Sequence, residues 1–193
     1  MDCDRFFVLT GGPGSGKTTL IEALRARGFA TTQEAGRSII REETQNDGRA
    51  LPWLDREGFA LRMFEWELAS YRQAERETGI VFFDRGLPDT LGYLRLEGIA
   101  VPAWMEGEAW RLRYNARVFV APPWQQIYGP DEERRQSWRL AVRTYETMVR
   151  TYTELGYTLV ELPPVPVPER ARFVLETAAV AHQAQAAPGG LRP

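Results

Sequence analysis

The chain has 193 residues, a length that fits one domain of ordinary size. Its 24 basic and 26 acidic residues give a formal charge of −2, which argues against a general nucleic-acid binder. An apolar fraction of 44% excludes a wholly disordered chain, and the single cysteine, Cys3, excludes an intrachain disulfide. The apolar run at residues 6–9 is too short for a signal peptide or a membrane span, so we expect a cytoplasmic protein without membrane contact.

Apolar runs of β-strand character alternate with helical patterns along the chain. Strands are predicted at residues 5–10, 29–33, 80–84, 117–121 and 157–162. Helices are predicted at residues 17–27, 35–45, 56–78, 88–96, 102–113, 135–155 and 167–182. Apolar strands joined through helices are typical of parallel βαβ units with helices on both faces of the sheet. We expect one α/β domain over residues 1–183 and a disordered tail, rich in Ala, Pro and Gly, at 184–193.

The glycine-rich segment after the first predicted strand matches a phosphate-binding pattern in full. Residues 11–18 read GGPGSGKT and fit G-x-x-x-x-G-K-[ST], with a strand before them and a helix after them. Glycines allow positive φ and bring backbone N–H groups close to phosphate oxygens, and the helix dipole adds to the attraction. The residues predicted to bind the phosphates of ATP are Gly11, Gly12, Pro13, Gly14, Ser15, Gly16, Lys17, Thr18 and Thr19.

Lys17 is the only lysine of the chain, and every other basic residue is arginine. A lysine ammonium is a mobile point charge that reaches the β- and γ-phosphates, and a planar guanidinium does not imitate it. We therefore predict that Lys17 is catalytic and stands exposed at the start of a helix. The hydroxyl of Thr18 is a predicted ligand of Mg²⁺, which would bridge the same phosphates. ATP and Mg²⁺ are the expected cofactors.

The third predicted strand ends in an acid followed by a base, Asp84 and Arg85. In doubly wound sheets ligands lie at the carboxyl ends of the strands, so Asp84 is expected to face the phosphates. There it would hold Mg²⁺ or accept a proton from an attacking hydroxyl. Arg85 would bind an anionic acceptor or the phosphoryl group in transfer. Both residues are predicted to be catalytic.

Together with the element order, the segments GGPGSGKTTL and FFDRG resemble P-loop kinases of nucleosides, nucleotides and other small metabolites. Thymidylate kinases carry a comparable Asp-Arg pair at the same strand end. The chain is still more similar to small bacterial proteins labelled AAA-domain ATPases or predicted kinases, which are related to the ribosylnicotinamide kinase half of bacterial NAD regulators. The resemblance covers residues 5–175. It implies a P-loop NTPase fold with a five-stranded parallel sheet in the order 2-3-1-4-5.

Two further segments carry this resemblance: residues 34–37, Glu-Ala-Gly-Arg, and residues 84–89, Asp-Arg-Gly-Leu-Pro-Asp. The resemblance implies that Glu34 and Arg37 line the acceptor site. Asp89 fits equally an ordinary acid in the first turn of a helix, where the dipole favours it.

An arginine-rich segment follows the fourth predicted strand, where the resembling kinases carry a lid. We expect the lid at residues 122–143. Arg134 or Arg135 would close on the γ-phosphate as an arginine finger supplied by the same chain. A solvated helix face is the alternative interpretation of these arginines.

Two functions fit these motifs. A small-molecule kinase would transfer phosphoryl from Mg-ATP to a nucleoside, a nucleotide or a related acceptor, and the helix at 56–78 and the lid would exclude water. A regulatory ATPase would act as a switch through a protein partner. A signalling GTPase is disfavoured because its N-K-x-D motif needs a second lysine. The kinase is the favoured hypothesis.

Overall fold

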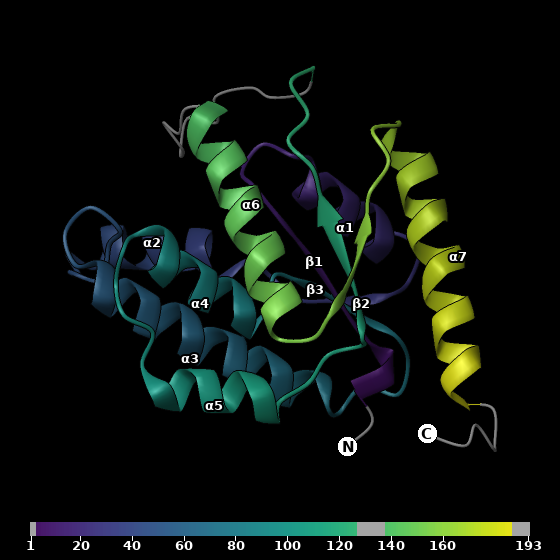
Figure 1. Cartoon of the computed structure of the whole chain (residues 1–193), viewed down its shortest axis with the longest axis horizontal. Coiled ribbons are helices and arrows are strands. Elements are labelled where there is room, and N and C mark those ends of the chain that lie inside the picture. The colour runs from purple at the N-terminus through teal and green to yellow at the C-terminus, as the bar shows by residue number, and fades with distance from the viewer. Residues whose placement is uncertain (1–2, 127–137, 187–193) are drawn as a thin grey trace.

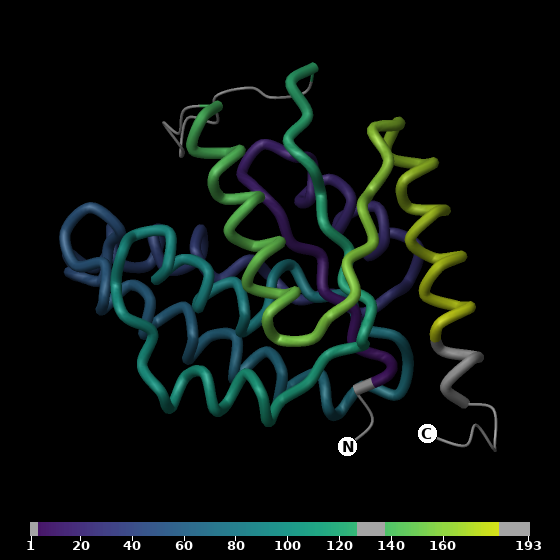
Figure 2. The backbone as a smooth tube through the Cα atoms, in the orientation of Figure 1, coloured from purple at the N-terminus to yellow at the C-terminus, as the bar shows by residue number. Residues whose placement is uncertain are grey.

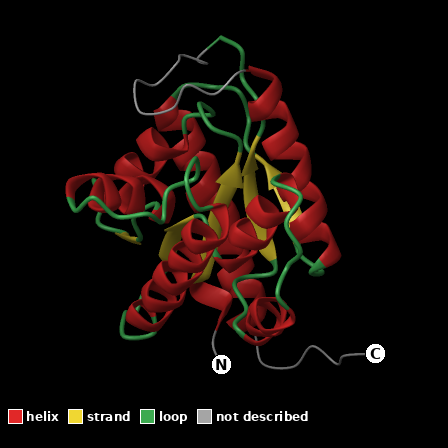
Figure 3. Cartoon of the chain, turned by 90° about the vertical axis from the view of Figure 1, so that its left-hand side faces the viewer, coloured by secondary structure: helices red, strands yellow, loops and turns green. Residues whose placement is uncertain are grey.

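The computed structural model describes residues 3–126 and 138–186 of the chain. Five parallel strands form one sheet in the order β2-β3-β1-β4-β5, with helices packed on both sides (Figures 1 and 3). The strands are β1 (Phe6–Gly11), β2 (Ala30–Thr31), β3 (Val81–Asp84), β4 (Arg117–Ala121) and β5 (Thr158–Glu161). The predicted fold class and strand order are confirmed.

The helices of the described residues lie close to their predicted ranges. They are α1 (Lys17–Arg25), α2 (Ala35–Gln45), α3 (Arg56–Ala74), α4 (Leu87–Leu96), α5 (Ala103–Arg111), α6 (Trp138–Glu154) and α7 (Val167–Ala186). The tail prediction is wrong at its start, because α7 continues to Ala186. β2 has two residues where five were predicted, since it is an edge strand that pairs only with β3. No helix of the described residues is both long enough and apolar enough to cross a membrane.

The first strand shows why the central strands are rich in consecutive apolar residues. Phe6 and Val8 pack in one cluster with side chains of α3, α4, α5 and α6, whereas Phe7 and Leu9 pack in a second cluster with side chains of α1 and α7. Successive strand side chains point to opposite faces, and helices cover both faces of this sheet. The backbone trace shows the same two layers of helices around the strands (Figure 2).

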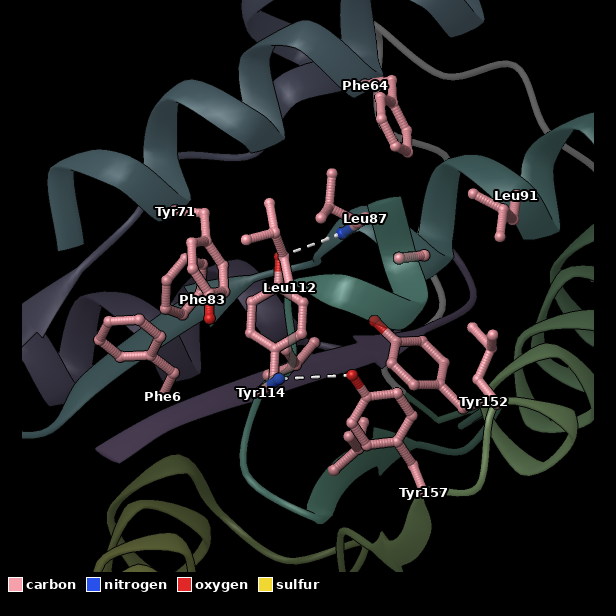
Figure 4. Packing of buried hydrophobic residues seen from close by; sticks show 14 of the residues in the cluster. Phe6, Phe64, Tyr71, Phe83, Leu87, Leu91, Leu112, Tyr114, Tyr152 and Tyr157 are labelled. Carbon is pink, nitrogen blue, oxygen red and sulfur yellow. Dashed lines mark hydrogen bonds between the residues drawn. The ribbon is translucent and has the colours of Figure 1, made fainter. Parts of the chain in front are cut away.

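Aromatic side chains fill the cluster beneath α3 and α4. The ring centroids of Phe6 and Tyr71 lie 5.2 Å apart, and those of Phe83 and Tyr114 lie 5.0 Å apart, both edge to face. The Leu87 N–H donates to the Tyr114 hydroxyl at 3.2 Å, which ties the start of α4 to this cluster (Figure 4). The packing fixes the carboxyl ends of β1 and β3 side by side, and the candidate site lies at those ends.

Candidate functional site

The glycine-rich loop connects the end of β1 to the start of α1. Gly11 has a φ of 128°, and a Cβ at this position would collide with the Ala121 carbonyl of β4. A Cβ on Gly12 would lie 2.5 Å from the Ala141 carbonyl of α6. Side chains are therefore sterically excluded here, because β4 and α6 press on the loop. Thr18 and Thr19 are exposed in the first turn of α1.

Lys17 is 6% exposed, so the prediction of an exposed ammonium is wrong. Its Nζ donates to the Gly11 carbonyl at 3.0 Å, the Gly12 carbonyl at 2.6 Å and the Ser15 Oγ at 3.1 Å. A four-carbon stem lets the ammonium fold back over its own loop, and loop acceptors satisfy its donors. The charge lies within the loop that was predicted to bind phosphate.

Asp84 is the last residue of β3 and is 4% exposed. Burial, reinforced by the nearby Glu34 carboxylate, raises the pKa of Asp84 to about 6, although Lys17 and Arg85 act in the opposite direction. Its Oδ1 is buried and has no hydrogen-bond partner among the described residues. Asp84 therefore presents a free carboxylate oxygen close enough to Lys17 for the two charges to interact.

The side-chain oxygens of Asp84 and Thr18 suit a magnesium ion that also binds phosphates. Mg²⁺ takes oxygen ligands and is held in such sites by one or two protein oxygens together with phosphates and water. Asp84 offers an unpartnered carboxylate oxygen, and Thr18 offers an exposed hydroxyl one residue after Lys17. In the described part of the chain no three His, Cys, Asp or Glu side chains form a metal cluster. A site completed by phosphates needs no such cluster.

Arg85 joins three parts of the site. Its Nε donates to Glu34 Oε1 at 3.1 Å, and its Nη1 donates to Asp89 Oδ1 at 3.0 Å and to the Gly11 carbonyl at 3.2 Å. Burial disfavours its charge, but Glu34 and Asp89 hold the pKa of Arg85 above its usual range. The backbone φ of Arg85 is 75°, a left-handed conformation that is uncommon outside glycine and costs about 1–2 kcal/mol. The Arg85 guanidinium is thus paired with the carboxylates of Glu34 and Asp89.

Glu34 lies between two arginines, Arg37 and Arg85. It precedes α2 directly, and its Oε2 is 3.2 Å from Arg37 Nε while its Oε1 accepts from Arg85. The structure therefore brings Glu34, Arg37, Asp84 and Arg85 together at the carboxyl ends of β2 and β3.

Asp89 is a functional candidate that sequence reasoning left open as an ordinary helix charge. It is 5% exposed and accepts hydrogen bonds from the Thr10 hydroxyl at 2.6 Å, the Tyr152 hydroxyl at 2.6 Å and the Gly86 N–H at 3.0 Å. Together with Arg85, these donors surround the carboxylate. The signal in the sequence was the Asp-Arg-Gly-Leu-Pro-Asp segment, in which Asp89 lies four residues after Arg85 and in the first turn of α4.

Glu67 is a second acid that sequence reasoning missed. It lies on α3 and is 2% exposed, and its Oε2 has no hydrogen-bond partner among the described residues. Burial first, and then the charges of Asp89 and Asp84, raise its pKa well above the usual value. The available signal was an acid on the buried face of α3, four residues before Tyr71.

A cavity of about 280 Å³ opens beside these charges. Glu34, Arg85 and Asp89 give it a polar side, and Pro13 of the glycine-rich loop also lines it. The rest of the lining is mostly apolar and comes from α2, α3, α4, α6 and the segment before α3. It includes Ile40, Trp53, Phe59, Met63, Tyr93 and Met148. A ligand in this cavity would lie against both the glycine-rich loop and the Glu34–Arg85–Asp89 cluster.

The predicted lid falls partly outside the described residues. Arg134 and Arg135 lie in the segment 127–137, which the structure does not describe, so their roles stay predictions. Trp124, just before that segment, donates its indole N–H to Gln126 Oε1 at 2.8 Å. α6 follows the segment and supplies Leu140, Thr144 and Met148 to the cavity.

A family model described as an AAA domain matches residues 6–170. The chain belongs to this AAA-domain family. Among curated proteins, no significant sequence match was found.

Solved structures of low sequence identity share the fold of this AAA-domain chain. A deoxyadenosine kinase from M. mycoides is 11% identical with a TM-score of 0.63, and the match covers 91% of this chain and 99% of that one. A thymidylate kinase from Ehrlichia chaffeensis is 14% identical with a TM-score of 0.58, over 91% and 98% of the two chains. A NadR protein in complex with NR is 21% identical with a TM-score of 0.61, over 98% of this chain. The AAA-domain chain spans about half of that NadR protein, 54% of its length.

Proposed function

We propose that this protein is a kinase that transfers the γ-phosphoryl group of Mg-ATP to a hydroxyl of a small acceptor. The observation that carries the proposal is a cavity lined both by Pro13 of the glycine-rich loop and by the Glu34–Arg85–Asp89 cluster. An acceptor there would lie beside the phosphates of a nucleotide bound to the loop. Such placement converts a bimolecular reaction into one between neighbours. The structural neighbours named above as deoxyadenosine and thymidylate kinases support the same reaction class.

The cavity favours an acceptor molecule that carries no charge on the part that lies against the Glu34–Arg85–Asp89 cluster. Among the described residues that line the cavity, Arg85 is the one arginine, and its guanidinium already donates to Glu34 and Asp89. A phosphate monoester at this place would lie close to both carboxylates. Apolar and aromatic walls suit a flat apolar body that carries a hydroxyl, as a nucleoside does. Tyr93 lines the cavity, and its hydroxyl, which is buried without a hydrogen-bond partner among the described residues, would donate to a polar atom of that body.

One group of residues would act on the acceptor, and a second group would bind the phosphates and Mg²⁺ of the nucleotide. Glu34 lines the cavity and would accept the proton of the attacking hydroxyl. The acceptor oxygen would then bond to the γ-phosphorus while the bond to the β-phosphate oxygen breaks and ADP leaves. Lys17 would supply positive charge to the β- and γ-phosphates. Thr18 and Asp84 would hold Mg²⁺, which neutralises phosphate charge when bound.

The proposal is tested by measuring ADP release with a panel of neutral nucleosides, their monophosphates and other small alcohols, each compared with the rate without acceptor. We expect one or more neutral hydroxyl compounds to raise ADP release and to appear as phosphate monoesters by mass spectrometry. Glu34→Gln should lower kcat by about 10²-fold or more, the usual contribution of a general base. Glu22→Gln, at an exposed acid of α1, serves as the matched control.

One result would contradict the kinase, and a second would contradict only its neutral acceptor. ADP release that no acceptor stimulates would favour the regulatory ATPase acting through a protein partner. Stimulation by monophosphates alone would contradict the neutral acceptor and leave a nucleotide kinase.

A further inference from the structure

Arg170 is a buried arginine that the proposed reaction does not use. It lies in the first turns of α7, which packs beside α1 (Figure 1). Its side chain is among the largest that are fully buried, with 2% of the residue exposed. Nη1 donates to the Ser15 carbonyl of the glycine-rich loop at 3.2 Å, and the guanidinium carbon lies 5.9 Å from the centroid of the Trp124 ring. Arg170 therefore touches the loop from the side of α7.

The charge of Arg170 has no acidic partner in the part of the chain that the structure describes. None of the ion pairs there includes Arg170, and its Nε has no hydrogen-bond partner. Burial is the cause that lowers the pKa of this guanidinium. A buried unpaired charge is unfavourable, whereas a buried arginine kept only for packing is commonly paired with a carboxylate. The groups that face this cation are a peptide carbonyl and an aromatic ring.

The peptide that accepts from Arg170 belongs to the loop that was predicted to bind phosphate. In a trans peptide the C=O and the N–H point in opposite directions. Because the Ser15 carbonyl points toward Arg170, the N–H of Gly16 in the same peptide points away from it. Within the described residues this N–H donates no hydrogen bond. The φ of Gly16 is 76°, and backbone turns of this kind direct successive N–H groups toward one anion.

We propose that Arg170 is a positioning residue for the polyphosphate of the nucleotide. It fixes the Ser15–Gly16 peptide and polarises it, so that the Gly16 N–H becomes a stronger donor to the α- and β-phosphates. The bound polyphosphate would in turn offset the unpaired charge of Arg170 through that peptide. This inference rests on the proposed binding of ATP by the loop, and it adds a residue that lies outside the glycine-rich motif.

The test is the affinity of wild type and Arg170→Met for the non-hydrolysable analogue AMP-PNP, ADP and adenosine, each measured by calorimetry with Mg²⁺. We expect Arg170→Met to weaken AMP-PNP and ADP about tenfold or more and to change adenosine less than about twofold, because adenosine has no phosphate. Arg172→Met is the matched control on the same helix, since Arg172 is 69% exposed, and it should bind all three ligands as wild type does.

Two conservative variants separate the charge from a purely structural contact, and they also serve if Arg170→Met fails to fold. Arg170→Lys keeps the charge, and Arg170→Gln keeps a donor for the Ser15 carbonyl without charge. We expect the lysine variant to bind ADP more tightly than the glutamine variant, with equal affinities for adenosine.

Equal losses for ADP and adenosine would overturn the inference and assign Arg170 to the base side of the site, through Trp124. Unchanged ADP affinity in Arg170→Met, or equal ADP affinity in the lysine and glutamine variants, would also overturn it. If wild type bound neither AMP-PNP nor ADP, the proposed function would fail as well. The wild-type titration therefore distinguishes the two failures.

Discussion

The Tyr152 hydroxyl of α6 donates to Asp89 Oδ2 of α4 at 2.6 Å, and both residues are buried. Asp89 in turn accepts from Arg85, whose guanidinium reaches the Gly11 carbonyl. One chain of hydrogen bonds therefore connects α6 with the first glycine of the loop. These hydrogen bonds tie α4 and α6 to the glycine-rich loop.

Tyr152→Phe tests these hydrogen bonds. The variant keeps the ring but leaves Asp89 Oδ2 with the Gly86 N–H as its remaining donor. We expect the free energy of unfolding to fall by about 1–3 kcal/mol, the usual cost of removing a partner from a buried polar group. Urea denaturation measures it. Tyr145→Phe is the control, because that hydroxyl donates to Glu161 at an exposed site, and the change there should stay within about 0.5 kcal/mol. Equal losses of unfolding free energy in the two variants would show that the Tyr152–Asp89 hydrogen bond stabilises the protein no more than the exposed one.

Arg85→Gly has two opposite effects on the free energy of unfolding, because it removes both backbone strain and an ion-paired cation. Glycine removes the strain of the positive φ, about 1–2 kcal/mol. It also leaves Glu34 and Asp89 without their shared cation, and breaking a buried ion pair costs about 3–5 kcal/mol. We therefore expect net destabilisation together with loss of turnover. Asp47→Gly is the matched control, since Asp47 is exposed with a φ of 52° and should be neutral or slightly stabilised. Chemical denaturation of both variants checks the sign, and a stabilised Arg85→Gly would refute the ion-pair argument.

Lys17→Ala should abolish turnover without unfolding the protein. Both loop carbonyls that accept from Lys17 keep a second donor, because Arg85 reaches Gly11 and the Ser15 hydroxyl reaches Gly12. We expect a loss of turnover of about 10²-fold or more and an unfolding free energy changed by about 1 kcal/mol. ADP release and thermal melting give the two quantities. Lys17→Arg should lose turnover as well, since a guanidinium does not replace the mobile ammonium. If Lys17→Arg kept its activity, the argument that the site requires a lysine ammonium would be wrong.

Asp84 gives the activity a predicted pH dependence. Burial beside Glu34 raises the pKa of Asp84 to about 6, so the carboxyl is protonated and unable to hold Mg²⁺ at lower pH. The kcat/KM of wild type should fall below about pH 6, since this parameter reports ionisations of the free enzyme. Asp84→Asn should be about 10²-fold slower and should lack this acid limb. A wild-type profile that stays flat down to pH 5 would contradict the role of an ionised Asp84.

Stability supplies an independent check on the same group. A raised pKa means that folded Asp84 holds its proton more tightly than the unfolded chain does. Its contribution to stability is therefore lost as the pH rises from about 4 to about 6. The unfolding free energy of wild type relative to Asp84→Asn should decrease over this interval, as denaturation at several pH values will show. A difference that increases would mean that the pKa is lowered rather than raised.

The strands of the sheet, the glycine-rich loop and most helix ranges could be predicted from the amino-acid sequence alone. These features depend on local patterns: β1 begins with four apolar residues, the loop motif lies between a strand and a helix, and the acid of β3 ends an apolar run. Such patterns act over a few residues, because side chains alternate along strands and repeat along helices. The strand order came from the resemblance to known kinases, which the β pairing confirms.

Which polar groups meet in the candidate site depends on the folding of the whole chain. Asp89 is central because Thr10 and Tyr152 reach it from distant elements. Arg170 lies 155 residues along the chain from the Ser15 carbonyl that it contacts. Partners so far apart leave no period in the sequence, since the packing of helices on the sheet alone brings them together. The contacts of Asp89 with Thr10 and Tyr152, and of Arg85 with Glu34, are of this long-range kind, and for that reason they became visible only in the folded chain.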